Sequence, residues 1–244
     1  MAADGRSFRP NPRVDVTAIA RAAWRQLTRG HTHYARASPK TCDAEVDNLV
    51  ADLAMIVRLA GQLMADASVS LHQADLKSAE SVISDADDIE ARCEDIDQRC
   101  LHLLTLRASV AMELHMVVAA MQVVQDLRRM CSLAQHIAEI ARLKHPIEPI
   151  PADVAPVSRQ MGVLASRLAE DAAAAIESQD SLSAVRLAQV DNEVDGLRRR
   201  IFQILFDQNW SHGVETAVDT ALIGRYYERF ADHAVAIARK IHRC

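Results

Sequence analysis

The stretch Ile223-Gly-Arg-Tyr-Tyr-Glu-Arg-Phe-Ala-Asp-His-Ala-Val-Ala-Ile-Ala-Arg-Lys-Ile-His242, near the C-terminus, decides the fold. Its apolar residues are spaced alternately by four and three positions, which places them on one face of an α-helix. They are Ile223, Tyr227, Phe230, Ala234, Ile237 and Ile241. About one hundred residues upstream the spacing recurs at Val123, Leu127, Met130, Ala134, Ile137 and Ala141, and Arg129 matches Arg229. The chain is therefore predicted to use one helical unit twice.

Composition favours a helical protein. The 244 residues are 50% hydrophobic but only 4% aromatic, and seven Gly and seven Pro leave few turn signals. An all-α protein fits this composition better than a sheet does. The longest uninterrupted apolar run, Met116 to Met121, is far shorter than the ~20 residues of a membrane span. We expect a protein that is soluble or peripheral to a membrane.

The cysteines and the charge distribution indicate the cellular compartment and exclude one kind of partner. The five cysteines are odd in number and form no CxxC pair, which favours a reducing compartment, the cytoplasm, over a disulfide framework. Residues 1–40 carry a net charge of +6, so the rest must carry −11 to give −5 overall. An acidic body argues against a nucleic-acid partner, because phosphate contacts need a basic surface.

Proline and charge divide the chain into four parts. Residues 1–40 form a basic N-terminal extension, which we expect to be a disordered leader; a membrane-surface or partner-binding arm is the alternative, and its composition also resembles an organelle transit peptide. Residues 41–145 form a first helical repeat, 146–153 a Pro-rich connector, and 154–244 a second repeat.

Each repeat is predicted to contain three long helices. The first runs from about 43 to 73, with Thr41 or Asp43 as its N-cap. The second has Cys93 and Cys100 within its apolar stripe, so both are expected to be core residues. The third runs from about 109 to 144 and stops before Pro146. Three more begin near Val157, before Leu187 and after Gly213. The predicted fold is all-α, two tandem three-helix bundles with six long helices.

Glu228 and Asp232 are the candidate site residues. They lie four positions apart and therefore one turn above each other on one helix face. At about 100° per residue they point roughly opposite the apolar stripe, and so away from the core. Two stacked carboxylates provide half of a site for a hard cation, although such pairs are also common on solvated faces. Arg225 and Arg229, beside them on the helix, are candidates for other roles at this site.

Motifs for catalysis are absent from the sequence. It contains no Glu-x-x-His pair of a ferritin-like di-metal centre, and no glycine-rich phosphate loop, G-x-S-x-G elbow or HExxH motif. We therefore expect a protein that is not an enzyme.

The stretch Tyr226-Tyr-Glu-Arg-Phe-Ala-Asp-His-Ala-Val-Ala-Ile-Ala238 resembles the C-terminal signature of the PhoU family, regulators of bacterial phosphate uptake. The resemblance covers about residues 41–243. Residues 74–83 and 87–90 resemble the opening of the family's second helix, and residues 191–195 resemble its counterpart in the second repeat. The stretch Trp210-Ser-His-Gly-Val214, before the sixth helix, is similar to the same segment in actinobacterial members of the family.

The resemblance implies a metal site. In the family the third and sixth helices each carry a Glu/Asp-x-x-x-Asp motif that binds metal clusters, and Glu228 and Asp232 match it. In the third helix Arg128 and Ser132 stand where acidic residues are expected, which leaves only Asp126 nearby. An Arg removes a ligand and adds a positive charge. We therefore expect at most one weak site, for a divalent or iron-type metal, in the second repeat only.

The resemblance also implies a function. It points to a cytoplasmic adaptor that represses phosphate uptake and phosphate-starvation signalling by contacting the phosphate-transporter ATPase and a PAS-containing sensor histidine kinase, and that reaches the membrane only through these partners. Two alternatives stay open: a metal-binding helical bundle, and an adaptor that serves another transporter or a stress pathway. A homodimer is also open, with residues 112–121 and 172–175 as candidate contact segments.

Overall fold

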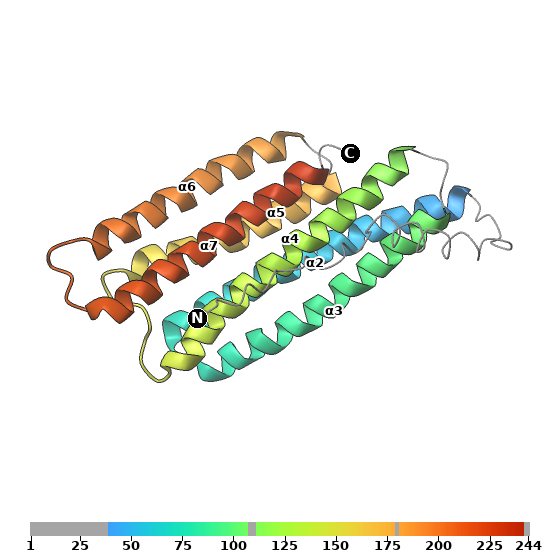
Figure 1. Cartoon of the computed structure of the whole chain (residues 1–244). Coiled ribbons are helices and arrows are strands. Elements are labelled where there is room, and N and C mark those ends of the chain that lie inside the picture. Colours follow the sequence, from blue (N-terminus) through green and yellow to red (C-terminus); the bar gives the residue numbers. More distant parts are fainter. Residues whose placement is uncertain (1–38, 107–110, 179–180, 242–244) are drawn as a thin grey trace, which may run out of the picture. The chain divides into compact units, whose positions relative to one another are not determined.

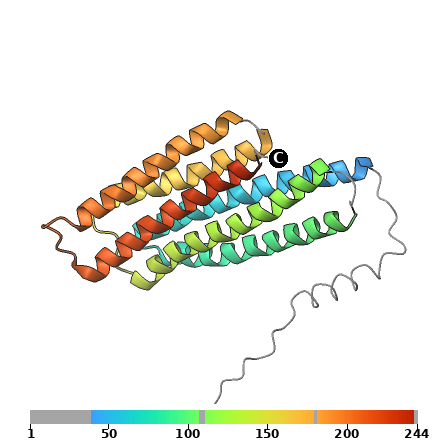
Figure 2. The same ribbon diagram turned by 45° about the horizontal axis from the view of Figure 1, so that its top comes forward.

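The computed structural model describes residues 39–106, 111–178 and 181–241, and these form six α-helices and no strand. In chain order the helices are α2 (Pro39–Gln73), α3 (Leu76–Leu106), α4 (Ala111–Lys144), α5 (Ala155–Ser178), α6 (Ser181–Leu205) and α7 (Gly213–Ile241). The six run side by side along a common direction (Figures 1 and 2). The predicted all-α fold of two three-helix bundles is confirmed. The predictions for residues 1–38 lie outside the described residues.

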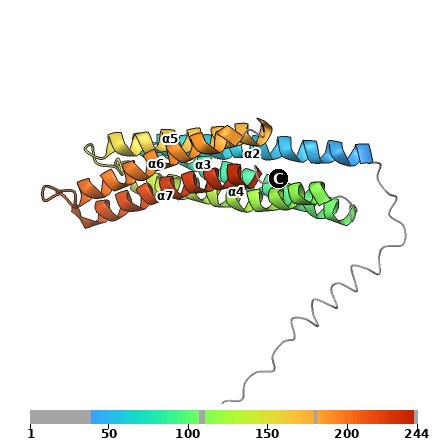
Figure 3. The ribbon, with the colours of Figure 1, turned by 90° about the horizontal axis from the view of Figure 1, so that it is seen from above.

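Both repeats have the same arrangement. α3 packs on α2 and α4 in the first repeat, and α6 packs on α5 and α7 in the second. The repeats meet through two helix pairs, α2 with α5 and α4 with α7. α2, α4, α5 and α7 therefore form the centre of the unit, while α3 and α6 lie at its two edges, as Figure 1 shows. Figure 3 shows α2 and α5 along one side and α4 and α7 along the other.

The heptad stripes read from the sequence form the core. All six residues of the α7 stripe and all six of the α4 stripe are buried, from Val123 to Ala141 and from Ile223 to Ile241. Burial of each large apolar side chain among them contributes on the order of 1.5–3 kcal/mol, and burial of each alanine contributes less. Because both stripes belong to central helices, one continuous apolar core serves both repeats.

Local signals set the helix ends. α2 begins at Pro39, so the predicted N-cap at Thr41 or Asp43 is wrong; proline suits the first turn because its missing N–H has no helical partner to bond. The Oδ1 atom of Asp75 caps α3 by accepting hydrogen bonds from the backbone N–H groups of Lys77 and Ser78, at 3.1 and 3.3 Å. At the start of α7, Gly213 has a φ of 82°, which a glycine adopts without strain.

Two glycines allow α2 and α5 to approach closely. A Cβ atom on Gly162 would lie 2.3 Å from the Oγ atom of Ser68, and one on Gly61 would lie 2.8 Å from the Cβ atom of Ala169. Beside them, the buried Tyr227 hydroxyl of α7 donates a hydrogen bond to Ser68 Oγ at 3.0 Å. Larger residues at these glycines would push the two repeats apart.

Within the part of the chain that the structure describes, one helix has the length and composition of a membrane span. This is the Ala44–Gln73 part of α2. Its most apolar segment of 18 residues has a mean hydropathy of 1.3, and half of that segment is buried inside the bundle. α2 also contacts three other helices, α3, α4 and α5. This packing is that of a core helix.

Candidate functional site

Glu228 lies between α7 and α6 and is buried, with 8% of its surface exposed. Its Oε1 atom is 3.3 Å from Arg198 Nε of α6, and its Oε2 atom accepts a short hydrogen bond from Arg225 Nη1 on its own helix. The expectation that Glu228 points away from the core is therefore wrong. α7 packs against three helices, so its buried arc is wider than the apolar stripe and includes the flank that faces α6.

Asp232 lies one turn further along α7 and is exposed, as expected. Its nearest cation is Arg229, with 3.9 Å between Nη1 and Oδ2 and both side chains 46% exposed. Such a surface pair contributes little to stability. Of the two arginines predicted beside the site, Arg225 therefore holds the buried carboxylate firmly and Arg229 holds the exposed one loosely.

α6 adds two carboxylates to the same region. Burial raises the pKa of Asp232, and the negative charges of Glu228 and Asp195 raise it further against the opposing effect of Arg229 and Arg225. Burial likewise raises the pKa of Asp191, together with the charges of Asp232 and Asp195. The candidate site thus consists of repelling carboxylates from two helices, which is an arrangement that a bound cation would relieve. The Asp-x-x-x-Asp spacing of Asp191 and Asp195, one helical turn, was the sequence signal for these two residues.

Asp126 belongs to a different contact, between α4 and α7. Its Oδ1 atom is 3.0 Å from His233 Nδ1, and its Oδ2 atom is 2.5 Å from Lys240 Nζ. Burial alone would raise the pKa of Asp126, but the hydrogen bonds from His233 and Lys240 outweigh it and lower the pKa. The structure therefore does not bring Asp126 together with Glu228 and Asp232; it joins the two repeats.

Arg128 of α4 occupies the place in the first repeat that Glu228 of α7 occupies in the second. Its Nε atom donates to Glu90 at 2.6 Å and its Nη1 atom donates to Asp97 at 2.7 Å, while Nη2 lies 3.3 Å from Glu94. All three carboxylates belong to α3, and the Arg128 side chain is only 22% exposed. Each nitrogen of the guanidinium thus meets one carboxylate, and α3 is tied to α4 by a network of three ion pairs.

The two repeats differ in their fit to a cation. In the first repeat the Arg128 guanidinium already stands between the three carboxylates, so the residues present do not fit a metal ion. In the second repeat Asp191, Asp195 and Asp232 have no such arginine at their centre, and these residues, with Glu228, are the ones that could hold a cation. Among the described residues, no group of three or more His, Cys, Asp or Glu side chains is already gathered in metal-ligand geometry.

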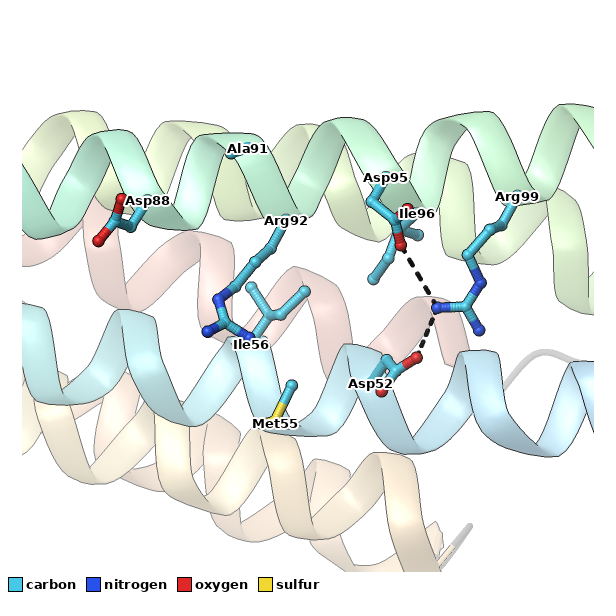
Figure 4. Close-up of a pocket in the computed structure, with 9 residues that line it drawn as sticks. All are labelled: Asp52, Met55, Ile56, Asp88, Ala91, Arg92, Asp95, Ile96 and Arg99. Atoms are coloured by element: carbon cyan, nitrogen blue, oxygen red, sulfur yellow. Dashed lines mark hydrogen bonds and ion pairs between the residues drawn. The ribbon is translucent and has the colours of Figure 1, made fainter.

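An open groove of about 520 Å³ lies between α2 and α3 (Figure 4). Arg99 spans it from α3, with Nη1 2.5 Å from Oδ2 of Asp52 on α2 and 3.6 Å from Oδ2 of Asp95. Ile56 and Ile96 are buried beneath. Arg99 thus joins the two helices of the first repeat through Asp52, and Asp88 and Arg92 of α3 also line the groove.

Cys93, Cys100 and Cys131 lie in the core and are free thiols. Burial raises the pKa of Cys93 to about 12 and that of Cys100 to about 11. Since the thiolate is the reactive form, these cysteines are structural, as the sequence predicts for Cys93 and Cys100.

Comparison with known proteins places this arrangement in a family. A family model described as the PhoU domain matches residues 43–141 and 158–241, one match in each repeat. The chain belongs to the PhoU family. It is 42% identical over 183 residues to the phosphate-specific transport system accessory protein PhoU homolog 2 of Mycobacterium tuberculosis, covering 75% of this chain and 86% of that protein. It is 39% identical to the PhoU homolog 1 of Mycobacterium leprae, covering 81% of this chain and 89% of that protein.

Solved PhoU structures have the same fold. The crystal structure of PhoU from Pseudomonas aeruginosa matches with a TM-score of 0.74 at 24% identity, covering 82% of this chain and 96% of that one. The phosphate transport system regulatory protein PhoU from Streptococcus pneumoniae matches with a TM-score of 0.71, also at 24% identity, covering 82% and 94%. The PhoU-type fold therefore extends over both repeats of this protein, and its named relatives are accessory or regulatory proteins.

Proposed function

We propose that this protein is a negative regulator of phosphate uptake and of phosphate-starvation signalling. It acts as a cytoplasmic adaptor between the ATPase subunit of a phosphate ABC transporter and a PAS-containing sensor histidine kinase. The observation that carries the proposal is the PhoU-domain match in both repeats, together with relatives named as phosphate-transport accessory proteins. A PhoU-type role requires contact with the transporter, and the kinase is the second partner that repression would need.

The structure is compatible with control by contact. α3 and α6 each pack mainly within their own repeat and leave their remaining faces at the edges of the unit. A helical surface of this kind acts by presenting a face to a partner. Repression follows when the adaptor binds one state of the kinase more tightly than the other, because it then shifts the population toward that state. In this role the protein is a regulator and not an enzyme.

The test is recovery of tagged protein from membranes of phosphate-replete and phosphate-starved cells, followed by mass spectrometry of the bound proteins. The proposal predicts enrichment of the transporter ATPase and the sensor kinase. Recovery of a different transporter or kinase in both conditions would favour the alternative adaptor role. A variant with Arg92→Glu, which reverses a charge that lines the α2–α3 groove and leaves the Arg99–Asp52 ion pair in place, serves to map whether that face takes part.

We further propose that any bound metal, divalent or iron-type, lies in the second repeat, at Glu228 and Asp232 with Asp191 and Asp195. Asp126 is the poorest of the candidate ligands, because both of its oxygens are already engaged by His233 and Lys240. Elemental analysis of Asp232→Asn and Asp126→Asn variants tests this. The proposal predicts loss of metal from the first variant only; loss from the second only would contradict it.

A further inference from the structure

We propose that Arg128 is a permanent cation of the first repeat. Its guanidinium stands where a metal ion would join α3 to α4, so this helix pair stays joined without any divalent cation. The inference concerns the internal structure of the repeat and does not depend on which partners the protein regulates.

The three carboxylates around Arg128 form one acidic row. Glu90, Glu94 and Asp97 follow each other at intervals of four and three residues, so they share one face of α3. Without a cation at their centre they would repel one another. Arg128 meets each of them with a different nitrogen atom, at 2.6, 3.3 and 2.7 Å. The positive charge is therefore required by the row itself and not only by the contact between the helices.

Burial is greatest at the centre of this network. The side chains of Arg128 and Asp97 are 22% and 19% exposed, whereas those of Glu90 and Glu94 are 53% and 60% exposed. The second oxygen of Asp97, Oδ1, is buried and has no hydrogen-bond partner among the described residues. Asp97 is thus the carboxylate that depends most on a cation from α4, because water reaches it least.

The second repeat contains the central ion pair of this network with its signs exchanged. The α3 stripe and the α6 stripe superpose when Cys93 is matched to Val194, and this register pairs Asp97 with Arg198. The α4 and α7 stripes pair Arg128 with Glu228. In the first repeat the arginine comes from α4 and the acid from α3; in the second the acid comes from α7 and the arginine from α6, 3.3 Å away.

The exchange leaves the two repeats with different needs. The matches of Glu90 and Glu94 are Asp191 and Asp195, and the match of Ser132 is Asp232. The second repeat therefore carries one more carboxylate. Sensitivity to divalent cations is accordingly expected at α6 and α7, where Arg198 and Arg225 pair with Glu228 alone, and not at α3 and α4, where Arg128 pairs with all three carboxylates.

Hydrogen–deuterium exchange of the purified full-length protein tests this, in EDTA and in MnCl₂. In the unaltered protein, exchange of α3 and α4 is expected to be the same in both conditions. In EDTA, the amides of α3 and α4 are expected to exchange about tenfold faster in the Arg128→Gln variant than in the unaltered protein. The substitution removes the hydrogen bonds of the guanidinium, and no metal ion is present to replace them. The Arg129→Gln variant is the control, because Arg129 is the exposed neighbour on the same helix and removes the same charge; it should leave exchange unchanged.

A second variant tests whether replacing Arg128 by an acid makes the α3–α4 pair depend on a metal ion. Arg128→Glu with Ser132→Asp gives α4 the same Glu-x-x-x-Asp pattern as α7, and it should expose α3 and α4 to exchange in EDTA and protect them in MnCl₂. Two results would overturn the proposal: Mn²⁺-dependent protection of α3 and α4 in the unaltered protein, or no response to Mn²⁺ in this double variant.

Discussion

Substitution of Gly162 by alanine is predicted to destabilise the protein by forcing the two repeats apart. The added Cβ atom would lie 2.3 Å from Oγ and 2.9 Å from Cβ of Ser68, and 3.4 Å from Cε1 of Tyr227. Real Cβ atoms do not approach other atoms at the first two distances, so Ser68 or the α2–α5 spacing must shift. Because α2 and α5 are central helices, the shift spreads into the common core.

The magnitude follows from three effects. Alanine gains about 1 kcal/mol over glycine inside a helix. Overpacking of a well-packed core costs about 1–3 kcal/mol. Displacement of Ser68 also weakens its 3.0 Å hydrogen bond from the buried Tyr227 hydroxyl, which contributes about 1 kcal/mol. The net loss is about 2 kcal/mol, which corresponds to a fall in Tm of about 4–8 °C for a protein of this size.

Gly196 provides the matched control. It lies inside α6, and a Cβ atom built on it meets nothing within 4 Å. Gly196→Ala should therefore show only the gain in helix propensity, a stabilisation of about 0.5–1 kcal/mol. Adding Ser68→Ala to Gly162→Ala removes the 2.3 Å contact but also the acceptor of the Tyr227 hydrogen bond, so the double variant should remain less stable than the unaltered protein.

Urea unfolding followed by circular dichroism at the helix band measures all of these variants under one set of conditions, in EDTA. The urea concentration at the midpoint is expected to be highest for Gly196→Ala, intermediate for the unaltered protein and lowest for Gly162→Ala. A Gly162→Ala variant as stable as the unaltered protein would refute the claim that close contact of α2 and α5 joins the repeats.

Two charge substitutions are predicted to act in opposite directions. Asp126→Asn should lower the free energy of unfolding by about 2 kcal/mol at neutral pH, because it weakens the hydrogen bonds from His233 and Lys240. The pKa of Asp126 is lowered in the folded state. The stabilisation by its carboxylate is therefore present above the pKa of the unfolded state and is lost as pH falls through the pKa of the folded state. Thermal unfolding from pH 7 to pH 3 should show the two proteins converging, and a constant difference would contradict the assignment. Asp191→Asn should instead stabilise the metal-free protein at neutral pH by a few tenths of a kcal/mol, because the raised pKa of Asp191 means that its charge is unfavourable when folded. As pH falls through that raised pKa the unaltered aspartate becomes protonated and the advantage of asparagine should vanish; a destabilised Asp191→Asn variant would count against repulsion at this site.

The stripes were readable from the sequence because α4 and α7 are central helices. Their faces repeat at heptad spacing from Val123 and from Ile223, and every predicted stripe residue is buried. The loss of acidic residues at Arg128 and Ser132 was equally visible. What Arg128 contacts was not, since helix periodicity gives the face of a residue but not the residue on the next helix.

Glu228 was predicted on the wrong side for the same reason. Its helix angle places it off the apolar stripe, but α6 covers that flank and supplies Arg198. Asp126 was named as the acidic residue left near the third-helix motif, but its actual partners His233 and Lys240 lie on α7, more than one hundred residues away in the chain. Charged residues on the flanks of central helices are thus where sequence periodicity predicts least.

The measurement that tests the central claim most directly is complementation. A bacterial strain that lacks every PhoU-family gene would receive this chain on a plasmid, and a phosphate-starvation reporter and phosphate uptake would be measured in phosphate-rich medium. The account predicts that the empty strain expresses the reporter and takes up phosphate at a high rate, and that this protein restores repression of both. If the protein accumulates in the cells at its normal stability and both stay high, the proposed role in phosphate regulation is contradicted.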